Sequence, residues 1–256
     1  MTGDLRVTFV GGPTALLELG GKRLLTDPTL SPAGSYGTPR PLTKTEEPGL
    51  TSQDLGPLDA VLLSHDQHAD NLDPAGRKLV EEMLLTVTTL IGAKRLGGTA
   101  QGLPPWATIT LGSVEVTAVP AQHGPPGAER VTGDVIGFIL GGRNLPTVYI
   151  SGDNASLEVV GQIARRIRRV DVALLFAGGA RTSVLNGAPL TLTSEDAAGA
   201  TRILNARHVV PLHTRGWQHF SEGPDRIRKA FADAGLTDRL HLLEPGESWT
   251  LPPRRD

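Results

Sequence analysis

The stretch LLSHDQHADNLD, residues 62–73, concentrates side chains that bind metal ions. His65 and His68 stand three positions apart, with Asp66, Asp70 and Asn71 beside them. The residues just before them, 60–63, form a continuous apolar run, which is typical of a buried strand. Imidazole and carboxylate groups on a loop anchored by a rigid strand are suited to hold a divalent ion, so the stretch indicates a metal site. The alternative is a polar turn that only faces solvent.

Further candidate ligands follow other apolar runs of the chain. His123 comes after residues 116–120, Asp153 after residues 148–152, and His213 after residues 209–212. A single histidine in such a place is more often a hydrogen-bonded structural residue. The recurrence at predicted strand ends is harder to dismiss, because strand ends from one side of a sandwich meet at one rim. His208 and His241 are expected to be structural.

Composition narrows the classes of protein that are compatible with the chain. The 256 residues include no cysteine, which excludes a disulfide framework, a thiolate zinc site and an iron–sulfur cluster. The formal net charge of −2 gives no electrostatic reason to expect nucleic acid, and the basic run at 165–169 is interpreted as a solvated helix face. No stretch approaches the roughly 18–20 apolar residues of a membrane helix, and no signal peptide is evident. We therefore expect no membrane insertion, a cytoplasmic location and a small-molecule substrate; a homo-oligomer is compatible with the sequence.

The apolar pattern predicts strands in the first part of the chain and alternating strands and helices later. A loop rich in Pro, Gly, Ser and Thr is expected over residues 31–57. This alternation is typical of two packed sheets with helices outside them. No change in composition marks a boundary, so we expect one domain over residues 1–256. Strands are predicted at residues 5–10, 14–19, 22–26, 59–63, 114–119, 135–140, 147–150, 170–176, 208–212, 240–243 and 248–251, and helices from residue 73 and at 156–169, 193–205 and 225–234.

The order and spacing of these motifs resemble the metallo-β-lactamase fold hydrolases over nearly the whole chain. VTFVGGPTALLELGGKRLLTDP, residues 7–28, is similar to the family's opening, and LLSHDQHADNLD resembles its signature loop. PAQH at His123, SGD at Asp153 and VPLH at His213 resemble the later ligand positions. The branch that looks most similar contains the L-ascorbate-6-phosphate lactonases. The resemblance implies a four-layer αβ/βα sandwich, in which two mixed sheets lie face to face with helices outside.

The signature loop departs from the usual H-x-H-x-D-H. When the loop is aligned with this pattern from its right end, His68 and Asp70 match the second histidine and the aspartate. Asn71 then replaces the final histidine, and Asp66 falls at the first histidine position. Aligned from its left end, His65 is the first histidine and one residue is inserted. We favour the insertion, because a one-residue bulge still lets both histidines face the site.

The resemblance implies hydrolysis by a metal-bound hydroxide held on one or two divalent ions. Asn71 would be a poorer ligand than imidazole, so the second ion would be held more weakly. Histidine with carboxylate suits zinc, and also manganese or iron. The implied ligands are His65, His68 and His123 for one ion, Asp70, Asn71 and His213 for the other, and Asp153 as a bridge between them.

Two residues are candidates for catalysis beyond metal binding. Asp70 could act as a general base or orient the attacking water. His219, which stands in HTRGWQHF, either faces the substrate or packs among aromatic side chains. Arg181 and Arg215 could meet an anionic substrate, although exposed arginines usually have no specific role.

The expected activity is hydrolysis of a lactone, ester, amide or phosphoester of a small molecule. A phosphodiesterase of the same fold is the alternative within this class. A metal-binding protein with weakened catalysis is the alternative outside it. That last alternative is motivated by Asn71 and by Gly12, which stands in GGPT where relatives often have G-H-x-T.

Overall fold

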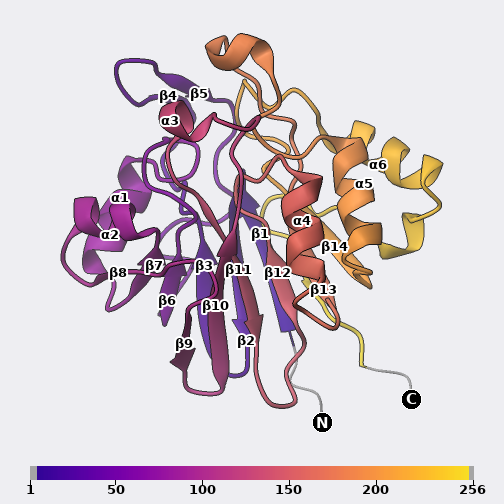
Figure 1. Ribbon diagram of the computed structural model, residues 1–256. Helices are drawn as coiled ribbons and strands as arrows, with labels where there is room; N and C mark the ends of the chain where they lie inside the picture. The colour runs from indigo at the N-terminus through magenta and orange to yellow at the C-terminus, as the bar shows by residue number, and fades with distance from the viewer. Residues whose placement is uncertain (1–4, 254–256) are drawn as a thin grey trace.

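Short strands form two mixed sheets that face each other in the computed structural model, which describes residues 5–253 (Figure 1). The first sheet has the order β15-β1-β2-β3-β6-β7-β8 and the second has the order β14-β13-β12-β11-β10-β9. The strands of the first sheet are β1 (Leu5–Gly11), β2 (Thr14–Leu19), β3 (Lys22–Thr26), β6 (Ala60–Leu62), β7 (Thr86–Thr88), β8 (Ala100–Gly102) and β15 (Ser248–Thr250). Those of the second are β9 (Thr108–Leu111), β10 (Val114–Pro120), β11 (Ile136–Gly141), β12 (Val148–Ile150), β13 (Val172–Phe176) and β14 (His208–Leu212).

Helices cover the outer face of each sheet, which completes the expected four layers and confirms the fold class. Apolar side chains of α1 and α2 pack on the first sheet, and those of α4, α5 and α6 pack on the second. Among the described residues, no helix is both long enough and apolar enough to span a bilayer. The helices are α1 (Pro74–Glu82), α2 (Leu90–Leu96), α3 (Glu129–Thr132), α4 (Leu157–Ala164), α5 (Ser194–Ile203) and α6 (Pro224–Asp233), with 3₁₀ turns η1 (Val184–Gly187) and η2 (Thr237–Arg239).

The main core lies between the two sheets. Alternate residues of the strands point inward, so that Phe9 and Leu17 of the first sheet share one apolar cluster with Phe138, Leu174 and other residues of the second. Full burial of a Leu or Phe side chain contributes roughly 1.5–3 kcal/mol relative to an exposed one. This layer therefore fixes the two sheets against each other and holds their edges in register.

Strands that run the same way end at one edge of each sheet. β3 and β6 are parallel neighbours, and so are β12, β13 and β14. β10 is antiparallel to β11, which is antiparallel to β12, so β10 runs in the direction of β12. The loops that leave β6, β10, β12 and β14 at their carboxyl ends contain the candidate ligands, and the loop that leaves β3 begins with Asp27.

The structure differs from the predicted elements in several places. Residues 240–243 make no strand; one isolated bridge joins Val209 to Leu240, and the backbone then turns away. The helix expected to reach residue 169 ends at Ala164, since four arginines within the next five residues repel one another and disfavour a further turn. Residues 83–111, where nothing was predicted, contain α2 and the short strands β7, β8 and β9.

The expected loop at residues 31–57 contains a small hairpin, β4 (Gly34–Tyr36) and β5 (Leu42–Lys44). Its base is tied to the segment before His219, because Thr45 N–H donates to Gly216 O (2.8 Å) and Gln218 N–H donates to Thr43 O (2.9 Å). Lys44 is only 4% exposed, and its ammonium donates to the carbonyls of Thr29 and Ser31. The hairpin is therefore an anchored part of the fold that stands beside the strand ends.

Candidate metal centre

Three buried residues and the half-buried His68 supply a first group of candidate ligand atoms that converge on one point. His65 and His68 come from the loop after β6, His123 from the loop after β10, and Asp153 from the loop after β12. His65 Nε2 lies 2.9 Å from His68 Nδ1, which lies 3.3 Å from His123 Nε2. Asp153 Oδ2 lies 3.5 Å from His123 Nε2 and 3.9 Å from His65 Nε2.

The far sides of two rings are fixed by neighbouring groups. His123 Nδ1 lies 2.7 Å from Leu190 O, so Nδ1 carries the proton and Nε2 turns a lone pair toward the group. His65 Nδ1 lies 2.9 Å from Ser64 Oγ. The main-chain N–H of Ser64 donates to Asp27 Oδ1 at 2.7 Å, so Asp27, at the end of β3, holds the loop that contains His65.

A second group shares Asp153 with the first. Asp70, Asp153 and His213 place one ligand atom each within 4.8 Å of the others. His213 Nε2 lies 3.2 Å from Asp70 Oδ2 and 3.6 Å from Asp153 Oδ1. Asn71 is fully buried beside them and donates through Nδ2 to Asp153 Oδ1 at 3.1 Å. Asp153 thus turns one oxygen to each group.

The donor atoms fit divalent cations. Ligands at 2.0–2.1 Å from a tetrahedral zinc lie about 3.3 Å from one another, which is close to the separations in both groups. In the first group three imidazole nitrogens and a carboxylate oxygen converge on one point, an arrangement that a bound cation would satisfy. In the second, Asp70 Oδ1 and Asn71 Oδ1 are buried without a hydrogen-bond partner. Such orphaned acceptors indicate room for a positive charge.

Burial and neighbouring charges set the protonation of the ligands. Burial holds the pKa of His65 well below its usual value, and His68 adds to this by repulsion. Burial likewise lowers the pKa of His68. Burial alone would raise the pKa of Asp70, but His219 and His213 outweigh it and hold that pKa well below the ordinary range. Neutral imidazoles beside an ionised carboxylate are the forms that bind metal.

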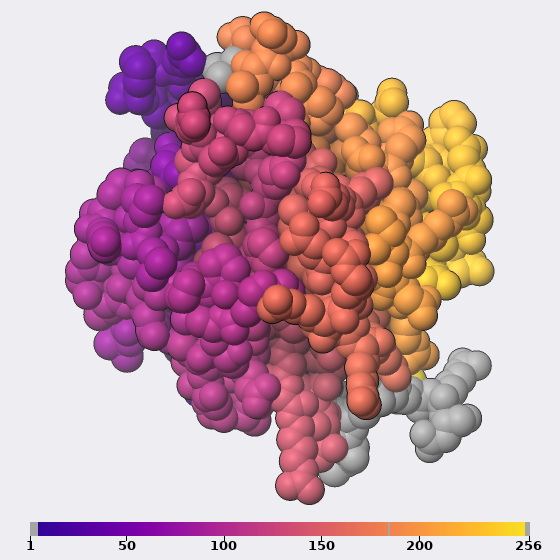
Figure 2. Space-filling model, in the orientation of Figure 1, coloured from indigo at the N-terminus to yellow at the C-terminus, as the bar shows by residue number. Residues whose placement is uncertain are grey.

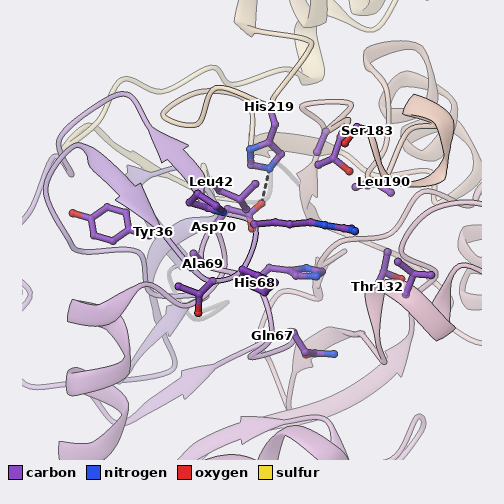
Figure 3. A pocket seen from close by; sticks show the side chains of 18 of the residues that line it. Tyr36, Leu42, Gln67, His68, Ala69, Asp70, Thr132, Ser183, Leu190 and His219 are labelled. Carbon is purple, nitrogen blue, oxygen red and sulfur yellow. Dashed lines mark hydrogen bonds and ion pairs between the residues drawn. The ribbon is translucent and has the colours of Figure 1, made fainter.

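His219 lies above Asp70 and donates a hydrogen bond to it. Figure 3 shows this contact, in which His219 Nε2 lies 2.9 Å from Asp70 Oδ2. Burial would lower the pKa of His219, but the charge of Asp70 and this hydrogen bond raise it. Among the described residues, His219 belongs to neither ligand group. It is therefore placed to hold a proton beside the site.

The structure places His65, and not Asp66, among the ligand atoms. The carboxylate of Asp66 turns away and accepts from Arg95 Nε at 2.8 Å. The intervening Gln67 is exposed, and its Oε1 accepts from the main-chain N–H of Asp66 at 3.1 Å. The extra residue is thus absorbed in the loop between the two histidines.

Trp217 occupies the space beside Gly12 that a side chain at this position would need. Gly12 has a φ of +54°, and a Cβ there would lie 3.1 Å from Trp217 Nε1. A larger residue would be strained in this conformation. The carbonyl of Gly12 accepts a hydrogen bond from the main-chain N–H of His213 at 2.7 Å. Where relatives often have a histidine side chain, Gly12 thus supports a candidate ligand through its main chain.

A cavity of about 660 Å³ opens onto both groups. Its lining includes His68, Asp70, His123 and His219. Tyr36 and Leu42 lie on one side in Figure 3, and Thr132, Ser183 and Leu190 lie on the other. In Figure 2 the hairpin (indigo) and the segment around residue 185 (orange) project at the top of the molecule, where these walls stand.

Sequence reasoning missed the residues that surround the ligands. Asp27 was part of the opening motif but had no assigned role, and the walls at residues 36–42 and 182–190 lie in segments without apolar periodicity. The DP pair at Asp27 and Pro28 was the one available signal. The two arginines considered for an anionic substrate are engaged elsewhere: Arg181 donates to Gly187 O and Arg215 pairs with Glu46 and Glu244.

Comparison with known families agrees with this fold and site. A beta-lactamase superfamily domain matches residues 22–214, and the chain belongs to this superfamily. The predicted enzyme class, a metal-dependent hydrolase, is confirmed. A UPF0173 metal-dependent hydrolase of Pyrococcus furiosus is 28% identical over 254 residues, covering 96% of this chain and 100% of that one. One of Pelotomaculum thermopropionicum is 28% identical over 260 residues, with the same coverage.

Solved structures share the fold at lower sequence identity. An isothiocyanate hydrolase from Delia radicum gut bacteria has a TM-score of 0.83 at 21% identity, covering 95% of this chain and 98% of that one. A metallo hydrolase from Ignicoccus hospitalis has a TM-score of 0.74 at 22% identity, covering 98% and 100%. A diiron β-hydroxylase from Streptomyces venezuelae has a TM-score of 0.69 at 19% identity, covering 97% of this chain and 54% of that one.

Proposed function

We propose that the protein hydrolyses a small, uncharged molecule at a carbonyl-type carbon: a lactone, an ester or an amide. The observation that carries the proposal is the pair of ligand groups that share Asp153 and reach a 660 Å³ cavity through His68, His123 and Asp70. His65, His68, His123 and Asp153 would hold one ion, and Asp70, Asp153 and His213 would hold the other. Zinc suits this donor set best, and manganese or iron are alternatives.

The side chains divide the remaining work. When bound, a divalent cation lowers the pKa of water from 15.7 to about 7 and polarises a carbonyl oxygen. Asp70 accepts a hydrogen bond from His219 and so keeps this ring beside the ligand groups at the cavity wall. The proton on His219 is available to the leaving atom of the substrate, because Asp70 raises the pKa of this ring.

The cavity favours an uncharged substrate over one that carries a phosphate group away from the reacting atom. Of the described residues that line it, Arg40 alone is a lysine or arginine. A phosphate group that does not touch the metal ions is recognised by arginine or lysine side chains, or by main-chain N–H clusters. Arg181 and Arg215 are bound to other groups. This argues against a phosphorylated lactone as the substrate, whereas a reacting phosphodiester could be bound by the ions themselves and is tested by the substrate panel.

A second candidate is hydrolysis of an isothiocyanate. The walls include the apolar side chains of Pro39, Pro41, Leu42, Val131 and Leu190, which suit an alkyl or aryl group. In the reaction, the oxygen of water adds to the central carbon, the C–N bond breaks, and nitrogen takes two protons. The products are an amine and carbonyl sulfide.

A substrate panel tests both candidates. The protein, loaded with zinc, manganese or iron, is assayed with uncharged lactones, esters and amides, alkyl and aryl isothiocyanates, and matched phosphoesters. We expect turnover of an uncharged class, its loss with a chelator, and its return with metal. Turnover of phosphoesters alone would refute the uncharged-substrate proposal. Bound metal without turnover of any compound would support a metal-binding protein with weakened catalysis.

A further inference from the structure

The carboxylate of Asp153 is the only link between the two ligand groups among the described residues. Its Oδ2 faces His65 and His123, and its Oδ1 faces His213. The side chain is 1% exposed, so bulk solvent does not reach it. The orientation of this one group therefore decides whether both sets of atoms converge.

Asn71 is the residue that fixes this orientation. Its Nδ2 donates to Asp153 Oδ1 at 3.1 Å, and it is fully buried. An ionised carboxylate only accepts hydrogen bonds, so the amide must turn its NH₂ end to Asp153. Asp153 Oδ1 keeps a second lone pair for the His213 group, so the amide and a cation need not compete.

The backbone around Asn71 holds the amide in place. The main-chain N–H of Asn71 donates to His68 O at 3.1 Å, and that of Leu72 donates to the same oxygen at 2.9 Å. Asp73, which follows, caps α1 by accepting from Gly76 N–H at 2.9 Å. The turn between His68 and α1 thus presents Asn71 rigidly to Asp153.

We propose that Asn71 is a positioning residue for both ligand groups, acting through Asp153, rather than only a weak ligand of the second. The inference rests on the proposed function in one respect, that the groups bind metal. A ligand role confined to the second group would leave the first group independent of Asn71. A positioning role makes the first group depend on Asn71, although Asn71 contributes no ligand atom to that group.

The test isolates the first group. In Asp70→Asn the second group loses its own carboxylate, so zinc titration of the metal-free protein by calorimetry reports the first group. Adding Asn71→Leu in this background is expected to weaken zinc binding by about 10- to 100-fold, the usual effect of losing a residue that orients a ligand. Unchanged affinity would overturn the proposal.

Two further measurements keep the result clear. Ser151→Ala is the matched control, because the Ser151 hydroxyl is buried near Asp153 but bonds the main chain of Gly152 and Phe176; its zinc affinity should stay unchanged. Equal weakening in this control would overturn the specific role of Asn71. The melting temperature of each metal-free variant shows whether it folds, and Asn71→Ala replaces the leucine variant if that one does not. Absence of zinc binding in the unaltered protein would refute the proposed metal centre itself, which is a different outcome.

Discussion

Replacing Lys44 by methionine should destabilise the protein far more than a surface substitution of the same kind. The ammonium of Lys44 donates to Thr29 O and Ser31 O, both at 2.7 Å, and lies 3.3 Å from Asp73 Oδ2. Lys44 and Asp73 are 4% and 0% exposed. Burial lowers the pKa of Lys44, which shows that its charge is held at a cost and is offset by these partners.

The magnitude follows from what the variant leaves behind. Removing one member of a buried ion pair costs about 3–5 kcal/mol. Asp73 keeps the N–H groups of Ser31 and Gly76, so the lower end, about 3 kcal/mol, is expected. For a chain of this size each kcal/mol lowers the melting temperature by about 2–4 °C, which gives a decrease of about 6–12 °C.

Lys22→Met is the matched control. Lys22 pairs with Asp59 at 2.7 Å, but both side chains are about one-third exposed. Such pairs contribute about 0–1 kcal/mol, so the control should melt within about 4 °C of the unaltered protein. Thermal unfolding followed by circular dichroism measures both. A Lys44→Met variant no less stable than Lys22→Met would refute the argument that this cation anchors the hairpin.

Three other predictions concern the histidines. His123→Ala should lower the affinity for metal by at least about 10- to 100-fold, whereas His241→Ala should leave it unchanged. Equal metal content of the two variants by elemental analysis would contradict the ligand assignment. His219→Gln should lower kcat by about 10²–10⁴ with metal content retained, whereas unchanged kcat would exclude proton donation. Burial and His208 lower the pKa of His241 to about 4. Because an unfolded histidine titrates near pH 6.5, the unfolded state takes the proton first, and stability should fall as pH decreases from about 6.5 to 4. His241→Gln should flatten this decrease in melting temperature, and an unchanged profile would contradict the assignment.

Much of the fold could be predicted because its strands are short, buried and apolar. The runs that end before His65, His123 and His213 were all found, and the common edge of the sheets then brought their ligands together. Strands such as β7 (TVT) and β8 (AQG) were missed because only one of their three residues is apolar, whereas the equally short β6 and β12 are apolar throughout. Residues 240–243 have the composition of a strand, but they pair with β14 through a single isolated bridge, between Leu240 and Val209, which the sequence does not show.

The surroundings of the ligands depend on contacts between distant residues. The amide of Asn71 meets Asp153 across 82 positions of the chain, and no local pattern shows which end of the amide faces the carboxylate. The hairpin at residues 34–44 is held by Lys44 and by bonds to residues 216 and 218. Its own sequence, rich in proline and glycine, is typical of a loop.

The two walls of the cavity are attached to the rest of the molecule differently, and this bears on how the protein can diverge. The hairpin is secured at its base, while its tip, residues 36–42, supplies side chains to the cavity and no ligand. The opposite wall includes Leu190, whose carbonyl fixes the ring of His123. Mutations at the tip can change which molecules enter without disturbing metal affinity, whereas changes that move the backbone at Leu190 also move the carbonyl that holds His123. We therefore expect the sequences of related enzymes to differ most at the tip of the hairpin, while the metal ligands stay the same.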